Sequence, residues 1–348
     1  MTVLEKKKIL LGMSGGIDST YAALRLIEEG HEVEGAVLIM HGLTELDSAR
    51  RAAKRLGIPL REIDCTEEFK RRVVEYFIDD YTQGRTPNPC IVCNPEVKFR
   101  YLYEHAVDGG FDLIATGHYA KIVESPLAPD RLAVRMGKDS KKDQSYMLYR
   151  LPQHILRRLV FPLADEEKAT VKDTSEKKGI SEPGQKESQE ICFIGDGSYR
   201  EYIESRRGES PEGNFIDPEG NILGRHRGIL HYTVGQRKGL GISLGERVFV
   251  TRINPETQEI TLSNEGASVK TIYVGDTVYS GIDELAVGST IRAEVKIRYQ
   301  ARPASAAVTV TPGGKIRVDF DEPQRFAAPG QSAVVYSDGV VLLGGFIL

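Results

Sequence analysis

The opening of this chain places an apolar run, a loop of small polar residues and a helical pattern directly after one another. The apolar run is residues 9–11, the loop of residues 14–19 reads Ser-Gly-Gly-Ile-Asp-Ser, and the helical pattern covers residues 20–29. The first N–H groups of a helix have no partner inside it, and glycines let the backbone approach an anion closely. The sequence therefore predicts a strand–loop–helix unit that binds phosphate groups, with a tight turn of no function as the alternative.

This loop differs from the common P-loop of nucleotide-binding proteins. No Gly-Lys-Ser/Thr follows its first glycine at the required distance, and the loop carries Asp18 instead. The difference disfavours transfer of a γ-phosphate. We expect the Asp18 carboxylate to help hold Mg²⁺ and to support no part of the core.

Length and charge limit the class of protein. With 348 residues the chain is long enough for two or three domains, and its net charge of −4 argues against a protein that coats nucleic acid indiscriminately. Basic pairs such as Arg206-Arg207 and Arg237-Lys238 still permit a specific RNA partner. There is no apolar stretch near ~20 residues and no apolar segment after Met1, so we expect no membrane span, no secretion signal and a cytoplasmic location.

Strand-like and helix-like segments alternate in the first half, which predicts an α/β domain with a parallel sheet. Strands are expected at residues 33–40, 58–63 and 111–118. Ligands bind at the carboxyl ends of such strands, so the first loop, the end of strand 33–40 and Gly117-His118 should share one rim. Residues 95–105 are expected to form a helix.

Beyond about Arg206 the helical patterns stop and short segments alternate with turn residues. Residues 291–299 alternate apolar and charged side chains, and residues 315–320, 331–336 and 340–348 are further candidate strands. We expect an N-terminal domain over residues 1–205, a small central β-rich module over 206–268 and a C-terminal β-barrel-like module over 269–348.

Cys90 and Cys93 form a Cys-x-x-Cys that follows a loop stiffened by two prolines. Near a helix N-terminus a thiolate is stabilised and its pKa is lowered, which favours reactive sulfur. Half of a zinc site is the less favoured alternative, since zinc usually takes four ligands. A thioredoxin-like dithiol fits less well, because no first strand of that fold precedes the pair.

The remaining candidates are weaker when taken one at a time. Cys192 alone would most often be a buried small side chain, although Lys186 nearby could lower the pKa of its thiol. Cys65 has no such neighbour and is expected to be structural. Residues 142–146 suit contact with a base or a phosphate backbone, and a helix N-terminus capped by Asp143 explains them equally well. His118 is a structural imidazole or, at the rim, a functional one.

Segments along nearly the whole chain resemble the tRNA 2-thiouridylases, the MnmA family of PP-loop enzymes. These segments are residues 12–19, 86–99, 117–120, 142–146, 190–194, 232–242, and 329–331 with 343–345. The first is shared with many synthetases, and the last three make the resemblance specific. In that family ATP adenylates the C2 oxygen of the wobble uridine of certain tRNAs, and sulfur then displaces AMP.

The resemblance implies roles for individual residues. The resemblance assigns ATP binding to Gly12, Met13, Ser14, Gly15, Gly16, Ile17, Asp18, Ser19, Leu38 and Gly117. It assigns binding of the target base to Asn88, Pro89 and Cys90. It assigns contacts with tRNA to His118, Lys142, Asp143, Gln144, Arg298, Tyr299 and Gln331. Cys93 aligns with the nucleophile of the family and Cys192 with its persulfide-bearing cysteine.

The chemistry implied by the resemblance needs ATP, Mg²⁺ and sulfur from outside. A cysteine desulfurase or a sulfur-relay protein is the expected donor, and a second thiol can release persulfide sulfur by forming a disulfide. Two rival functions are a PP-loop enzyme that thiolates tRNA cytidine and a zinc-stabilised RNA-binding protein without turnover.

Two departures from the family pattern matter. Residues 40–49 are shorter than in several members, and Cys90 stands where many members have Asp. Cys90, Cys93 and Cys192 together provide three thiols, which suit an iron–sulfur cluster with one open iron. The persulfide route needs only two thiols, so both routes stay open.

Overall fold

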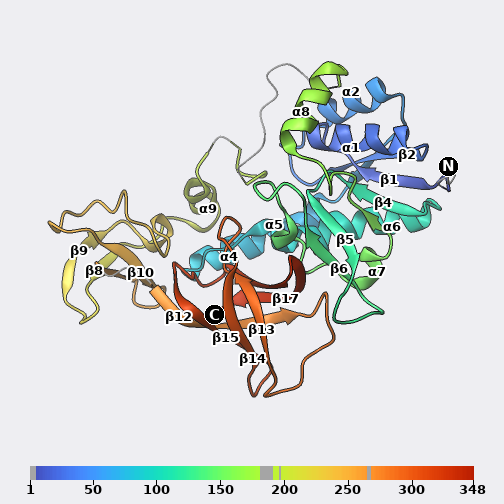
Figure 1. Ribbon diagram of the computed structural model, residues 1–348. Coiled ribbons are helices and arrows are strands. Elements are labelled where there is room, and N and C mark those ends of the chain that lie inside the picture. Colours follow the sequence, from blue (N-terminus) through green and yellow to red (C-terminus); the bar gives the residue numbers. More distant parts are fainter. Residues whose placement is uncertain (1–4, 181–190, 196, 265–267) are drawn as a thin grey trace.

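The structure, a computed structural model, describes residues 5–180, 191–195, 197–264 and 268–348. Lys186 and the start of segment 190–194 lie outside the described residues. In the described part, no helix is both long and apolar enough to cross a lipid bilayer. Figure 1 shows an N-terminal α/β region, a small β module that projects to one side, and a C-terminal barrel.

A parallel sheet forms the centre of the N-terminal region. Its strands are β1 (Lys8–Gly12), β2 (Glu32–Ile39), β3 (Leu60–Asp64), β4 (Leu113–Thr116) and β7 (Leu159–Val160), in the order β3-β2-β1-β4-β7. All neighbouring pairs run parallel, as the alternation of patterns predicts. The chain moves outward from β1 to β2 and β3 and returns to β4 on the other side of β1. The carboxyl ends of β1 and β4 therefore flank the point where the strand order reverses, which is where such sheets bind ligands.

Helices cover both faces of this sheet (Figure 1). The helices of the described residues are α1 (Ile17–Glu28), α2 (Leu46–Leu56), α3 (Thr66–Phe69), η1 (Lys70–Val74), α4 (Glu75–Thr82), α5 (Pro89–Cys93), η2 (Asn94–Lys98), α6 (Phe99–Asp108), α7 (Gln153–Leu156), α8 (Lys168–Lys177) and α9 (Tyr199–Arg207), with short 3₁₀ turns η3 (Ser145–Met147) and η4 (Ile229–His231). Of these, α9 and η4 lie toward the small module and not on the sheet (Figure 1). Side chains alternate along β1: Ile9 and Leu11 pack on the face of α1, whereas Leu10 packs in the cluster that holds Phe77 and Leu102. Burial of both faces explains the continuous apolar runs of these strands.

The C-terminal strands close into a barrel. They are β12 (Ser268–Val278), β13 (Thr290–Lys296), β14 (Ala304–Val310), β15 (Ile316–Arg325), β16 (Ser332–Ser337) and β17 (Val340–Ile347). The order β12-β15-β14-β13-β16-β17 is completed by pairing of β12 with β17, which removes the open edges. The expected barrel-like module is therefore confirmed. Arg298 and Tyr299 lie beyond the end of β13, so the strand is shorter than the predicted 291–299.

The small module between these regions has its own sheet and core. Strands β8 (Gly213–Ile216), β9 (Ile222–His226), β10 (Phe249–Asn254) and β11 (Glu259–Ser263) pair in the order β10-β11-β8-β9. Phe215, Tyr232 and Leu240 are among the buried residues of its separate apolar cluster.

A hairpin that the sequence patterns did not predict joins the N-terminal region to the barrel. Strands β5 (Ala120–Glu124) and β6 (Leu132–Met136) pair with each other, and β6 extends the barrel sheet by pairing Arg135 with Val340 of β17. Gly344 in β17 leaves room for an aromatic ring of the N-terminal region, because a Cβ there would lie 2.7 Å from Cδ2 of Tyr149. The two regions are therefore held together by backbone pairing and by close packing.

Candidate active site

The loop between β1 and α1 exposes helix N–H groups at the carboxyl edge of the sheet. Gly16 is the N-cap of α1 and offers no side-chain acceptor to the first turn. The Ser19 hydroxyl donates to the Gly16 carbonyl at 3.1 Å and lies 3.3 Å from the hydroxyl of Ser14. The hydroxyls thus brace the loop while the helix N-terminus faces outward, an arrangement suited to phosphate.

Two glycines in this region are required by close backbone contacts. Gly15 has φ of +80°, and a Cβ there would lie 2.3 Å from the carbonyl carbon of Ser48. Gly117, just after β4, has no room for a side chain because a Cβ would lie 2.8 Å from the Ser19 nitrogen. The loops after β1 and β4 are therefore in contact, as expected for a shared rim.

Asp18 makes contacts that differ from the expectation. Its two carboxylate oxygens each lie 2.8 Å from the Lys168 ammonium, and its Oδ1 also accepts from the Tyr119 hydroxyl at 2.8 Å. Lys168, at the start of α8, is buried with 9% of its surface exposed. Asp18 thus neutralises a buried cation and does contribute to the packed structure, because the ammonium would otherwise lose its counter-charge.

The other residues assigned to ATP lie on or beside the strands. Gly12 ends β1, Met13 follows it and donates its N–H to the Ala36 carbonyl at 2.8 Å, and Leu38 lies near the end of β2. Met13 and Leu38 are buried. These residues shape the rim, whereas Ser14 is exposed on it.

Cys90 and Cys93 lie within the first turns of a helix that begins earlier than predicted. The Asn88 side chain caps α5 by accepting from the Cys90 N–H at 3.2 Å, and Pro89 occupies the first turn. The helix continues through η2 into α6, so residues 95–105 form only its later part. Pro95 has no N–H to donate, and the wider π-helical turn of η2 contains it.

The thiols are more strongly protonated than the sequence suggested. Burial raises the pKa of Cys93 to about 12, although the nearby Lys98 ammonium opposes that rise. Burial and the Cys90 thiol raise the pKa of Cys192 to about 11, again against Lys98. Burial also raises the pKa of Cys90, although the side chain keeps exposed surface. Desolvation therefore outweighs the helix N-terminus that was expected to lower these pKa values.

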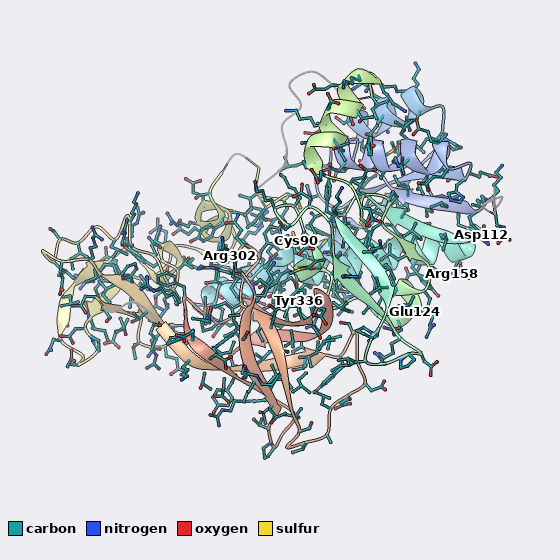
Figure 2. The ribbon with its side chains drawn as sticks, in the orientation of Figure 1. Cys90, Asp112, Glu124, Arg158, Arg302 and Tyr336 are labelled. Carbon is teal, nitrogen blue, oxygen red and sulfur yellow. The ribbon has the colours of Figure 1, made fainter. Side chains whose placement is uncertain are left out.

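The three cysteines come from two segments that share one electrostatic neighbourhood. The pKa of Cys93 is raised in part by Cys90 and Cys192. The Cys93 Sγ also lies 3.9 Å from the Met40 sulfur, just after β2, which places this thiol at the carboxyl edge of the sheet. Cys90 is in the middle of the molecule, between the N-terminal region and the barrel (Figure 2).

Cys192 is held in place by the next residue. Phe193 is buried, with its ring centroid 5.6 Å from that of Phe69 and 5.3 Å from that of Phe77. Cys192 itself keeps exposed surface, as Cys90 does, although the surrounding protein raises the pKa of its thiol. Cys65 is different: its buried thiol donates to the Ile39 carbonyl at 3.4 Å, in agreement with a structural role.

The cysteines do not form a metal-ligand set. Over the ranges that the structure describes, no three His, Cys, Asp or Glu side chains are grouped to hold a metal ion. Among the described residues, Cys90, Cys93 and Cys192 therefore do not form such a group, either for the iron–sulfur cluster that was one of the two routes considered or for the zinc alternative. All four cysteines are free thiols.

His118 and Gln144 are engaged with their neighbours. The His118 Nδ1 lies 2.7 Å from the Thr116 hydroxyl, and burial together with Lys98 lowers its pKa well below the usual value. The imidazole is therefore neutral near pH 7. The Gln144 side-chain oxygen accepts from the Tyr119 N–H at 3.0 Å.

Asp143 is buried and bonded to its neighbours in the protein interior. It is 4% exposed, and its carboxylate accepts from the N–H and the hydroxyl of Ser145 at 3.1 and 2.9 Å. These bonds hold Ser145, the first residue of η3, whose N-cap residue, Gln144, makes no side-chain cap. The buried Lys296 ammonium lies 3.9 Å away and faces the rings of Tyr146 and Tyr299. Lys296 was expected on the polar face of a strand, but this buried partner draws it inward.

The remaining tRNA candidates lie on the barrel side and beside Asp143. Arg298 is exposed, and the pKa of the half-buried Tyr299 hydroxyl is raised by burial and by the nearby Asp143 and Cys90 and lowered by Lys142. Of these residues, Tyr299 is therefore near both Asp143 and Cys90. Gln331 donates its side-chain amide to the Thr86 carbonyl at 2.7 Å.

Sequence reasoning missed two cations of the site. Lys98 acts on the pKa values of the three cysteines and His118, and Lys168 pairs with Asp18. For Lys98 the signal was its position five residues after Cys93, one helical turn along. For Lys168 the local sequence offers no signal, because 150 residues separate it from Asp18.

Family models match almost the entire chain. The tRNA methyl transferase HUP domain matches residues 7–196, the tRNA methyl transferase PRC-barrel domain matches 200–264, and the aminomethyltransferase beta-barrel domain matches 269–347. Among curated proteins, the tRNA-specific 2-thiouridylase MnmA of Clostridium perfringens is 41% identical over 99% of both chains. The protein of the same name from Clostridium botulinum strain Alaska E43 is 41% identical over 99% of this chain and 98% of its own.

Solved structures resemble about half of the chain. A 4-thiouridine synthetase–RNA complex with bound ATP matches with a TM-score of 0.34 and 19% identity, over 50% of this chain and 41% of that one. A predicted subunit of a tRNA methyltransferase from Methanocaldococcus jannaschii matches with a TM-score of 0.32 and 16% identity, over 49% of this chain and 76% of that one.

Proposed function

Because this chain belongs to the family of tRNA-specific 2-thiouridylases named MnmA, we propose that it uses ATP to thiolate the wobble uridine of tRNA at C2. The observation that carries the proposal is the meeting of two features at the carboxyl edge of the parallel sheet. The phosphate-binding loop follows β1, and Cys93 lies beside Met40 at the end of the adjacent strand β2. A nucleotide and a thiol can therefore act on one bound base.

The first step is adenylation. The uridine C2 oxygen attacks the α-phosphorus of ATP, and pyrophosphate leaves, which converts a poor electrophile into one with AMP as leaving group. The N–H groups at the start of α1 supply partial positive charge to the phosphates, and the Asp18–Lys168 ion pair fixes the first turn of this helix against α8. ATP would enter as its Mg²⁺ complex. We assign no metal to Asp18, because both of its oxygens accept from Lys168.

The second step is sulfur transfer. A cysteine desulfurase or a sulfur-relay protein loads Cys192 as a persulfide, whose terminal sulfur attacks C2 and displaces AMP. The Cys93 thiolate then attacks the Cys192 sulfur, so that a Cys93–Cys192 disulfide forms and the new sulfur stays on the base. An external dithiol reduces this disulfide. Lys98 stabilises the thiolate that the attack requires, and the cytoplasm provides tRNA, ATP and reductant together.

Nucleoside analysis tests the function directly. We expect the purified protein, given unmodified tRNA, ATP, cysteine and a cysteine desulfurase, to form 2-thiouridine and to release one AMP for each sulfur added. Deletion and complementation followed by mass spectrometry of tRNA nucleosides checks the same reaction in cells. Formation of 2-thiocytidine, or tRNA binding without AMP release, would point to one of the two rival functions.

Arg298 is proposed to bind the tRNA backbone. Arg298 is exposed, two residues beyond the end of β13, and it precedes Tyr299, which lies near Cys90. We expect Arg298→Ala to weaken tRNA binding several-fold at moderate salt and to reduce the salt slope of the affinity by about 1, because one phosphate contact is lost. ATP binding should not change.

The control for this prediction is Arg292→Ala. Arg292 also lies on β13 and is exposed, but its guanidinium pairs with Asp321 at 2.9 Å. Titrations of labelled tRNA at several salt concentrations compare the two variants. Equal tRNA affinity of Arg298→Ala and the unmodified protein would show that the residues just after β13 do not bind tRNA.

A further inference from the structure

The barrel is hydrogen-bonded to the loop that precedes Cys90 and Cys93. Residues 329–331 lie in the connection between β15 and β16, and they contact residues 85–86, which lie in the connection between α4 and α5. The Thr86 N–H donates to the Pro329 carbonyl at 2.8 Å, and the Gln331 side-chain amide donates to the Thr86 carbonyl at 2.7 Å. Both backbone polar groups of Thr86 are therefore satisfied by the barrel, across 245 residues of sequence.

The barrel side of this contact is closely packed. Gly330 has φ of +87°, and a Cβ there would lie 2.9 Å from the Arg85 Cβ and 3.0 Å from the Thr86 nitrogen. The Gly330 N–H donates to the Ile347 carbonyl at 3.0 Å, and the Ile347 N–H donates to the Gln331 carbonyl at 2.8 Å. The connection is thus bonded to β17 and cannot shift without it.

The loop side is equally constrained. The Arg85 Nε lies 2.8 Å from the Asp80 carboxylate, and Asp80 is only 6% exposed. Beyond Thr86, Pro87 and Pro89 have fixed φ angles on either side of Asn88, the N-cap of α5. A displacement at Thr86 is therefore transmitted over two residues to the helix that carries Cys90 and Cys93.

We propose that Gln331 is a positioning residue for this cysteine-bearing helix, through its bond to Thr86. The barrel then sets the geometry of the sulfur-transfer site in addition to carrying tRNA. The role of Gln331 in catalysis rests on the proposed function. The contact with Thr86 also predicts that Gln331 affects the reactivity of Cys90 and Cys93 in the protein without tRNA. The competing account is the tRNA contact that the family resemblance implies for Gln331.

The test compares variants of the full-length protein. Gln331→Met keeps the length of the side chain and removes its donor, and Gln331→Glu places a carboxylate against the Thr86 carbonyl. Gln324→Glu is the matched control, since Gln324 is on the same barrel and donates its amide to the nearby Glu322 carbonyl. Three quantities are measured: alkylation of Cys90 and Cys93 by iodoacetamide without tRNA, tRNA affinity at two salt concentrations, and thiolation at saturating tRNA.

We expect both Gln331 variants to change the alkylation rates several-fold and to lower thiolation at saturating tRNA by about ten-fold or more, since small displacements of reacting groups are costly. The tRNA affinity and its salt dependence should match those of Gln324→Glu. Weaker tRNA binding with unchanged alkylation would overturn the inference in favour of a tRNA contact, and unchanged values throughout would overturn it as well. Alkylation needs no turnover, so a failure of the proposed function would be seen separately, as missing 2-thiouridine with the unmodified protein.

Discussion

Cys93→Ser and Cys192→Ser are each expected to abolish formation of 2-thiouridine, with a loss of about 10³-fold or more. In the proposed reaction Cys192 carries the sulfur and Cys93 releases it, so neither thiol can replace the other. Adenylation needs no thiol, and a single burst of pyrophosphate from ATP and tRNA should therefore persist in both variants. Quantifying pyrophosphate and thiolated nucleoside in the same reaction separates the two steps.

Cys90→Asp is the matched control, because it alters a thiol of the same neighbourhood and introduces the residue found in many relatives. We expect it to keep thiolation, with no stoichiometric iron or sulfide in protein purified anaerobically. Loss of activity together with loss of bound iron would support the cluster that the geometry does not favour. Substantial thiolation by Cys93→Ser or Cys192→Ser would contradict the persulfide route and the cluster route together.

Asp18→Asn is expected to reduce AMP and pyrophosphate formation by about 10²-fold or more. Asparagine keeps an acceptor for the Tyr119 hydroxyl but removes the charge that holds the Lys168 ammonium beside the loop. Asp18→Ala should lose the same activity and also lower the melting temperature, because the buried Lys168 ammonium loses both of its bonds to the Asp18 carboxylate. Activity is measured with unmodified tRNA, and unfolding is followed by circular dichroism.

Asp173→Asn provides the comparison for this prediction. It also removes a carboxylate from a lysine of α8, but the Asp173–Lys177 pair is exposed, so we expect at most about 1 kcal/mol of lost stability and no loss of adenylation. A folded Asp18→Asn protein that forms AMP at the normal rate would remove the carboxylate from the mechanism. A drop of equal size in Asp173→Asn would show that the loss comes from α8 in general.

Local patterns in the sequence account for much of the fold. The apolar run before the loop and the alternation of segments predicted a parallel sheet with a phosphate-binding turn at its rim, and β1, β2 and β4 place that turn as expected. Such patterns succeed because the periodicity of a strand or helix is contained in adjacent residues. The C-terminal strands were recognisable for the same reason, although closure of the barrel through β12 and β17 was not.

The sequence also determined, through its motifs, which residues to examine for chemistry, and it was wrong where the answer depended on burial. The thiol pKa values were expected to be low from the helix N-terminus alone. The surrounding side chains desolvate Cys93 and raise its pKa to about 12. Asp143 was expected to contact tRNA or to cap a helix, and Lys296 to lie on the charged side of a strand, yet both side chains are buried beside each other. Local sequence does not reveal the partner whose interaction offsets the cost of burying a charge.

By itself, then, the sequence determined most of the order of secondary structure, the loop after the first strand and the family, and it identified the cysteines to test. Only the tertiary structure decided that Lys168 neutralises Asp18, that β6 joins the barrel sheet, and that Gln331 holds the loop before the cysteines. Each of these contacts joins segments more than a hundred residues apart in the chain. They form because several elements pack at once, and no window of adjacent residues contains that information.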